Sequence, residues 1–319
     1  MTRPLDGIVI GFNGISQTSG DRLREIAPDA EVRFVPEHPD DWTGLLDNAE
    51  IVFGWPDPGA LAQSHIRFHQ LPSSGYDQYR TPSLLIKNFF QLSNARGVVA
   101  RAVAEHAIAC ILAFNRNLPQ HWREQQSGVW GRAAQYALAK GQTLLVVGLG
   151  AIGQELASMA HALGMRVIAA NRTPRSTPCV DHVYSFSELD RALSRADHIV
   201  LTLAADSSAP PVINSELLKS VKPSAYLYNL ARGCVLDEQA LVDTLHENRI
   251  AGAALDVFTT EPLPRSSSLW SAPRLLITPH AGGRFEAENE ALTSLFLENL
   301  DRYVHGRPLL NVVIGKDCQ

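Results

Sequence analysis

Short apolar runs alternate along this chain with segments in which apolar residues recur at helical spacing. Residues 144–147 form one such run, which is too short for most helices and therefore predicts a buried strand. From residue 152 the apolar positions follow a helical period as far as Gly164, a residue typical of a helix end. A second apolar run covers residues 167–170. This order predicts a strand–helix–strand unit.

The rest of the chain carries the same kind of alternation. Strands are predicted at residues 7–11, 31–35, 50–54, 67–71, 84–88, 180–184, 198–203, 226–230, 251–255 and 275–278. Helices are predicted at residues 97–116, from 187, at 214–220, 237–247 and 286–304. Strands that alternate with helices indicate mostly parallel sheets. Because the final helix follows a sheet that is already complete, we expect it to pack back on the first part of the chain.

A G-x-G-x-x-G motif fills the turn between the strand at 144–147 and the helix after it. Gly148 permits the tight turn, Gly150 lets the backbone approach a pyrophosphate, and Gly153 lets the helix pack closely on the strand. Together with Ala151 and Ile152 they are the predicted cofactor-binding residues, since the helix N-terminus points at the phosphates. The flanking strands make this a dinucleotide site rather than a glycine-rich turn without a ligand.

These elements predict an α/β protein with two domains. We expect a Rossmann-type doubly wound parallel sheet, the dinucleotide-binding domain, at residues 97–286. It is inserted into a smaller, flavodoxin-like α/β domain, the substrate-binding domain, formed by residues 1–96 and 287–319.

Composition and charge indicate which binding partners and which cellular compartment to expect. The 319 residues are 45% hydrophobic and 19% charged, with a net charge of −5, which offers no electrostatic attraction for nucleic acid or an anionic membrane. No signal or transit peptide and no membrane-spanning stretch is recognised. The four cysteines lack metal-ligand spacing, which indicates reduced thiols in a cytoplasmic protein without a metal site.

Three stretches that follow predicted strands each carry one charged or titratable side chain: Arg232, Glu261 and His280. In doubly wound sheets ligands bind beyond the carboxyl ends of strands. A guanidinium suits a carboxylate or a developing alkoxide, and an imidazole bonded to a carboxylate can donate a proton near neutral pH. Each residue taken singly is also explained by an ordinary surface role. Beside a dinucleotide site, the three together indicate carbonyl reduction by hydride transfer.

Two further segments leave alternatives open. The loop at residues 72–77 contains Ser74 and Gly75, whose backbone N–H groups can bind an anion, although a turn that needs glycine explains it as well. Within the helix at 97–116, Glu105 and His106 are interpreted as structural groups held by local hydrogen bonds rather than catalytic ones.

The chain resembles the D-isomer-specific 2-hydroxyacid dehydrogenase family, and in particular its glyoxylate/hydroxypyruvate reductase-like members. The matching text is AVAEHA at 102–107, GLGAIG at 148–153, NLARG with LDEQAL within 229–241, AALDVFTTEPLP at 253–264 and LLITPHAGG at 275–283. Several separate motifs in one order make this resemblance specific.

The resemblance implies a two-domain oxidoreductase, a homodimer, whose active site lies in a cleft and reduces a small 2-keto acid to the D-2-hydroxy acid. It implies that Arg232 binds the substrate carboxylate and carbonyl, that His280 is the acid/base, and that Glu261 pairs with His280. It also implies that the Ser74–Gly75 loop binds the substrate carboxylate through backbone N–H groups, and that Asp256 contacts the nicotinamide side of the cofactor.

One departure from the family pattern concerns the cofactor. NAD-preferring members carry an acidic residue at the end of the second cofactor strand, whereas this chain has Asn171 followed by Arg172 and Thr173. A carboxylate would repel a 2′-phosphate, while Asn beside Arg and Thr can accept one. We therefore predict that NADP(H) is preferred, with NAD(H) also usable.

Three alternatives remain at this stage. Formate dehydrogenases of this architecture place glutamine at the position of Glu261, which argues against that activity. A phosphoglycerate dehydrogenase-type enzyme often carries an extra C-terminal domain, for which residues up to 319 leave no room. A dinucleotide-sensing corepressor-type binding protein can share both the fold and the three side chains. The identity of the 2-keto acid is left open.

Overall fold

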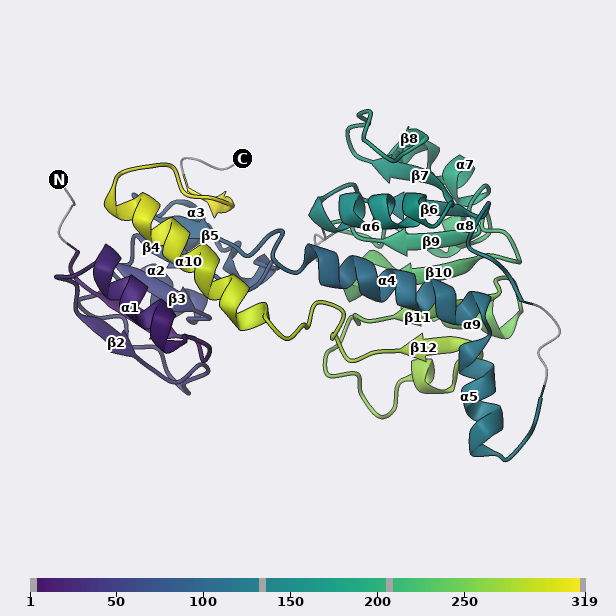
Figure 1. The fold of residues 1–319 in the computed structure, drawn as a ribbon, viewed down its shortest axis with the longest axis horizontal. Helices are drawn as coiled ribbons and strands as arrows, with labels where there is room; N and C mark the ends of the chain where they lie inside the picture. The colour runs from purple at the N-terminus through teal and green to yellow at the C-terminus, as the bar shows by residue number, and fades with distance from the viewer. Residues whose placement is uncertain (1–4, 132–135, 205–208, 316–319) are drawn as a thin grey trace. The chain divides into compact units, whose positions relative to one another are not determined.

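The computed structural model describes residues 5–131, 136–204 and 209–315 (Figure 1). The chain forms two compact units, residues 1–99 with 285–319 and residues 100–284. Each unit is a sheet with helices, so the α/β fold predicted from the sequence is confirmed.

The first unit is built on a six-stranded sheet in the order β13-β5-β4-β3-β1-β2. Its strands are β1 (Ile8–Gly11), β2 (Val32–Phe34), β3 (Ile51–Gly54), β4 (Phe68–Gln70), β5 (Gln91–Ser93) and β13 (Val312–Ile314). Its α-helices are α1 (Gln17–Ile26), α2 (Pro58–Gln63), α3 (Pro82–Leu85) and α10 (Glu288–Val304), with a 3₁₀ helix at Asp77–Tyr79. β1 to β5 pair in parallel in the flavodoxin-like order, and β13 adds to β5 antiparallel.

The C-terminal helix belongs to the core of this first unit. α10 lies beside α1 (Figure 1), and the ring of Phe296 stacks on that of Phe53 in β3, with centroids 4.5 Å apart. β1 and β3 are fully buried, as expected for parallel strands covered on both faces. Burial of this apolar surface is what brings the two ends of the chain into one unit.

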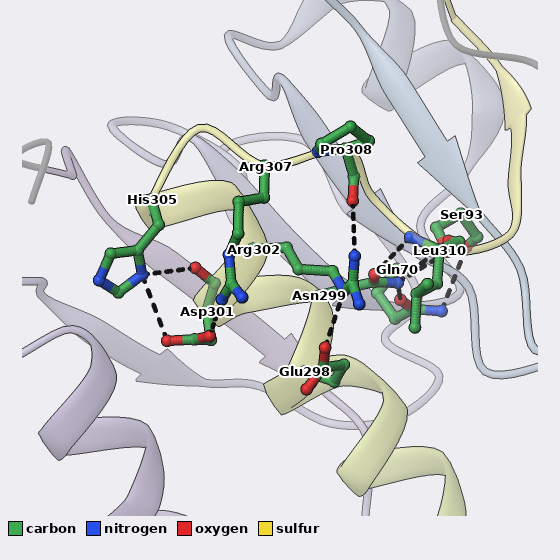
Figure 2. A network of polar contacts seen from close by, with 10 residues as sticks. All are labelled: Gln70, Ser93, Glu298, Asn299, Asp301, Arg302, His305, Arg307, Pro308 and Leu310. Atoms are coloured by element: carbon green, nitrogen blue, oxygen red, sulfur yellow. Dashed lines mark hydrogen bonds and ion pairs between the residues drawn. The ribbon is translucent and has the colours of Figure 1, made fainter.

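A buried asparagine ties α10 to the sheet (Figure 2). Asn299 is fully buried; its Nδ2 donates to Gln70 Oε1 at 2.8 Å and to Ser93 Oγ at 3.0 Å, and its Oδ1 accepts from Leu310 N at 2.7 Å. These bonds connect the helix to β4, to β5 and to the segment that leads into β13. They therefore help to fix the end of β4, after which the Ser74–Gly75 loop begins.

The second unit is built on a seven-stranded parallel sheet in the order β12-β11-β10-β9-β6-β7-β8. Its strands are β6 (Thr143–Val147), β7 (Arg166–Asn171), β8 (His182–Ser185), β9 (His198–Leu201), β10 (Tyr226–Asn229), β11 (Gly252–Leu255) and β12 (Leu275–Ile277). Its α-helices are α4 (Ala100–Asn115), α5 (Leu118–Gln126), α6 (Ala151–Ala162), α7 (Leu189–Leu193), α8 (Ser215–Leu218) and α9 (Glu238–His246). The 3₁₀ helices are Phe186–Glu188, Gly233–Val235 and Ser268–Ser271. The order reverses between β6 and β9, which is the Rossmann arrangement.

One strand predicted from the sequence is wrong. Residues 84–88 form the end of α3 and a turn, and the fifth strand lies at Gln91–Ser93. The helix starts here because Thr81 Oγ1 caps it by accepting from Leu84 N at 3.4 Å, and Pro82 occupies its first turn. Leu85 and Ile86, which suggested a buried strand, are 57% and 79% exposed. α2, α5 and β13 were not predicted.

Among the described residues, no helix has both the length and the apolar character that crossing a membrane requires.

Candidate active site

The glycine turn after β6 has a shape that admits a phosphate. Gly148 has a φ of +104°, and a Cβ there would lie 2.6 Å from Leu203 Cα. A Cβ on Gly153 would lie 2.2 Å from Gly148 O, so the helix can approach the turn only without side chains at these positions. Gly150, the N-cap of α6, has no heavy atom within 4 Å of its Cβ position and no side-chain cap. Space and backbone N–H groups for an anion thus coincide at the helix N-terminus.

The end of β7 presents cationic side chains. Asn171 is the last residue of the strand, and its Nδ2 donates to Thr173 O at 3.3 Å. Arg172 and Arg175 are exposed, and neither guanidinium forms an ion pair within the part of the chain that the structure describes. These groups leave positive charge beside the position where an acidic residue would bind ribose hydroxyls.

Arg232 lies in the turn that follows β10. Asn229, which is 1% exposed, donates from Nδ2 to Arg232 O at 2.9 Å and accepts at Oδ1 from Ala231 N at 3.1 Å. The Arg232 side chain is half-buried, and its Nη1 donates to Ala231 O at 2.7 Å. The buried amide therefore fixes the backbone from which the guanidinium extends.

The Arg232 turn packs directly on the loop after β11. A Cβ on Gly233 would lie 1.9 Å from Phe258 C and 2.0 Å from Thr259 N, so the two backbones touch. In the same loop Phe258 N donates to Glu261 Oε1 at 2.8 Å. The contact thus links the arginine's turn to the segment that orients the Glu261 carboxylate.

Glu261 and His280 form a hydrogen-bonded pair. His280 Nδ1 lies 2.7 Å from Glu261 Oε2, and their side chains are 50% and 35% exposed, respectively. Because an ionised carboxylate only accepts, Nδ1 carries the proton in this bond. His280 Nε2 forms no hydrogen bond with any described residue, which leaves it available to a ligand. The arrangement is that of an imidazole oriented by an acid for proton transfer.

Asp256 holds the turn on which His280 sits. Its carboxylate is 4% exposed; Oδ1 accepts from Thr278 Oγ1 at 2.6 Å and from Ala281 N at 2.9 Å, and Oδ2 accepts from Gly282 N at 2.9 Å. Burial raises the pKa of the nearby Cys110 thiol to about 11, and the charge of Asp256 adds to this rise. The carboxylate is engaged with the turn after β12 rather than exposed on a surface.

The Ser74–Gly75 loop belongs to the first unit and follows β4. Its oxygens are bound within that unit: Asn94 Nδ2 donates to Ser74 O at 2.6 Å, Ser74 Oγ to Ala95 O at 3.2 Å, and Ser73 Oγ to Gly75 O at 2.9 Å. In the described part of the chain, the backbone N–H groups of Ser74 and Gly75 donate to nothing. A loop with its acceptors used and its donors unused suits an anion.

The structure therefore connects Arg232, Glu261 and His280 through contacts within the second unit, while Ser74 and Gly75 lie in the first. Sequence reasoning missed the residues that hold these groups, above all Asn229 and Gly233. The glycine directly after Arg232 was the available signal, since such a position often marks a close backbone approach.

Comparison with known proteins identifies the family to which the chain is similar. Residues 108–282 match the family model of the D-isomer specific 2-hydroxyacid dehydrogenase NAD-binding domain. A glyoxylate reductase of Pyrococcus furiosus is 33% identical over 241 residues, which cover 73% of this chain and 71% of that protein. A glyoxylate reductase of Thermococcus litoralis is 30% identical over 302 residues, which cover 92% and 85%.

A solved structure is also similar over nearly the whole chain. The D-isomer specific 2-hydroxyacid dehydrogenase of Xanthobacter autotrophicus Py2, in complex with NADPH and MES, superposes with a TM-score of 0.80 at 26% identity. The superposition covers 97% of this chain and 98% of that one.

Proposed function

Because the chain belongs to the D-isomer specific 2-hydroxyacid dehydrogenase family, whose members are NAD(P)-dependent enzymes, we propose that it reduces a small 2-keto acid to the D-2-hydroxy acid. A glyoxylate- or hydroxypyruvate-like compound is the proposed substrate, since two of its relatives are glyoxylate reductases. The observation that carries the proposal is the 2.7 Å contact between His280 Nδ1 and Glu261 Oε2. Glu261 lies in the loop against which the Arg232 turn packs.

In this reaction His280 is the proposed acid. Glu261 accepts from Nδ1 and so orients the ring, which leaves Nε2 to carry the proton that passes to the carbonyl oxygen. The nicotinamide cofactor, when bound, supplies the hydride that adds to the carbonyl carbon. Arg232 is proposed to bind the substrate and to stabilise the negative charge that develops on oxygen before the proton arrives.

The Ser74–Gly75 loop is proposed to bind the carboxylate of the substrate. Its two unused backbone N–H groups match two carboxylate oxygens in chemistry, and its own oxygens are turned to internal donors. Fixing the substrate at its carboxylate converts an encounter between molecules into a reaction of positioned groups, which removes part of the entropic barrier.

NADP(H) is the proposed cofactor, with NAD(H) also usable. The glycine turn and the N-terminus of α6 are proposed to hold the pyrophosphate through Gly148, Gly150 and the residues up to 153. Arg172, exposed and without an ion pair among the described residues, is proposed to bind the 2′-phosphate together with Asn171. Asp256 is proposed to act on the nicotinamide side of the site by holding the His280 turn.

The test is a panel of 2-keto acids, beginning with glyoxylate and hydroxypyruvate, with NADPH and NADH as reductants. We expect loss of NADPH absorbance, formation of the D-2-hydroxy acid, and a higher kcat/KM with NADPH than with NADH. Asn171→Asp is the matched variant: its carboxylate repels a 2′-phosphate and binds ribose hydroxyls, so it should shift the preference toward NADH. Tight cofactor binding without turnover of any 2-keto acid would instead favour a dinucleotide-sensing protein.

We further propose a homodimer that works in the cytoplasm. Leu118 and Trp122 on α5, and Val129 and Trp130 after it, are all more than half exposed, which is a large apolar area for a monomer. Cys110 and Cys179 are in no disulfide bond, as is usual in a reducing compartment. Light scattering at several protein concentrations tests the dimer, and a monomer mass throughout would contradict it.

A further inference from the structure

α4 reaches the turn of the catalytic histidine through one side chain. His106, half-buried in the first half of this helix, has its Nε2 3.3 Å from Thr278 Oγ1. The same hydroxyl donates to Asp256 Oδ1 at 2.6 Å. Because a hydroxyl has a single proton and gives it here to the carboxylate, it accepts from His106, so Nε2 is the protonated ring nitrogen.

Asp256 also accepts hydrogen bonds from the backbone of the turn that carries His280. His280 N donates to the carbonyl oxygen of Asp256 at 2.8 Å, while Ala281 N and Gly282 N donate to its carboxylate, each at 2.9 Å. The N–H groups of three successive residues therefore all donate to one buried residue. Any shift of the Asp256 carboxylate displaces the turn that carries the imidazole.

The turn needs this support because its backbone is strained. His280 has a φ of +52°, in the left-handed region that a residue with a side chain adopts only at a cost in free energy. A Cβ on Gly282 would lie 2.9 Å from Asp256 Oδ2 and 3.4 Å from the His106 ring, so helix, carboxylate and turn are in close contact. Hydrogen bonds that hold a strained turn are well placed to set the direction of its side chain.

We propose that His106 is a positioning residue for the reduction. Its Nε2–H orients the Thr278 hydroxyl, which orients the Asp256 carboxylate, which holds the backbone at His280 in the conformation that presents the imidazole to the substrate. This role rests on the proposed function of His280. It replaces the expectation that His106 is held only by local bonds in its own helix, where its neighbour Glu105 does pair locally with Arg101 at 3.0 Å.

The test compares His106→Gln, His106→Asn and His106→Leu in the intact enzyme. The amide nitrogen of glutamine can occupy the position of Nε2, whereas that of asparagine corresponds to Nδ1 and leucine has no donor. We expect kcat to fall about tenfold in the Asn and Leu variants, the rate equivalent of one net hydrogen bond, while Gln stays near wild type. KM and the dissociation constant of NADPH should change little, because the proposed role of His106 acts through Thr278 and not through contact with either ligand. His246→Leu, at the exposed end of α9, is the control that should leave kcat unchanged.

Thr278→Val provides an independent variant and, with His106→Leu, forms a double-mutant cycle. It should lower kcat as much as His106→Leu, and the double variant should be no slower than either single one, since both break the same path. Wild-type kcat in His106→Leu, a Gln variant as slow as the Leu variant, or additive losses in the double variant would each overturn the proposal.

Two measurements separate this inference from the proposed function. Wild-type turnover of 2-keto acids tests the function, and the ratio of variant to wild type tests His106. Hydrogen exchange of the Ala281 and Gly282 amides needs no substrate: it should be faster in His106→Leu and near wild type in His106→Gln. Unchanged exchange in His106→Leu contradicts the inference whatever the enzyme reduces.

Discussion

His280 is held at two points that differ in kind. Its backbone N–H bonds to the carbonyl of Asp256, and its ring Nδ1 bonds to the carboxylate of Glu261. The first bond supports a left-handed backbone, and the second fixes the rotation of the ring. Because Nδ1 is used in the second bond, Nε2 is the ring atom available to a ligand, which is why this one side chain is the proposed proton donor.

Replacing His280 should therefore affect chemistry more than binding. We expect His280→Ala to lower kcat about 100-fold or more, the range that a positioned general acid contributes, with little change in NADPH affinity. Glu261→Gln should have a smaller effect, because its amide oxygen still accepts from Nδ1 but its negative charge is lost. Steady-state kinetics with a separate cofactor titration measures both. Wild-type turnover by His280→Ala would remove its assignment as the acid.

Among the elements, the segments that follow β10 and β11 are in close contact at one glycine. Gly233 brings the Arg232 turn against the backbone of Phe258 and Thr259, and Glu238, in the first turn of α9, accepts from Thr259 N at 2.6 Å. The loop after β11 is thus fixed from two directions. Because the same loop carries Glu261, the positions of arginine and histidine depend on how these neighbouring strand ends pack.

Gly233→Ala should disrupt this junction. A Cβ 1.9 Å from Phe258 C cannot be accommodated without moving a backbone, so we expect a loss of about 2 kcal/mol or more in the free energy of unfolding, together with reduced kcat/KM. Gly20→Ala is the control: Gly20 lies inside α1 with no atom within 4 Å of its Cβ position, and alanine should stabilise the helix by about 0.5–1 kcal/mol. Urea unfolding measures both. Equal stability of the two variants would contradict the proposed junction.

At the scale of the whole molecule, each unit contains one fully buried histidine that is neutral when folded. Burial lowers the pKa of His69, in β4, and of His198, in β9, to about 4. His69 Nε2 lies 2.9 Å from Gly54 O, and His198 Nδ1 lies 2.9 Å from Tyr228 Oη. The charge of Asp197 raises the pKa of His198, but the effect of burial is larger, so protonation is opposed in both sheets.

Acid should therefore destabilise both units over the same range of pH. In the unfolded chain a histidine has a pKa near 6.5. Between about pH 6.5 and 4 the unfolded chain therefore binds a proton that the folded chain does not, so the free energy of unfolding is highest above about pH 6.5 and falls as the pH drops towards 4. The free energy of unfolding should fall by at most about 1.4 kcal/mol per pH unit for each histidine. His198→Gln should flatten this slope for the second unit and leave that of the first unchanged. Thermal unfolding between pH 7 and 4 measures it, and a wild-type slope in the variant would count against this cause.

Local pattern predicted much of this molecule. The glycine turn, the helix it starts and the strands on both sides follow from a few adjacent residues, and so do most other elements of the second unit. The failure at residues 84–88 came from competition between signals: Leu84, Leu85 and Ile86 have the apolar character of a strand, but a capping threonine and a proline start a helix first. Only Leu84 is buried there, which the sequence does not reveal.

The sequence by itself determined the α/β class, the Rossmann turn and the family, because each depends on residue types at short and regular spacing. Only the tertiary structure decided which residues hold the candidate site: Asn229 beneath Arg232, Gly233 against Phe258, and His106 joined to Thr278 across 172 positions of the chain. Such contacts arise when separate strands and helices pack together, and their energy depends on burial and distance rather than on sequence spacing.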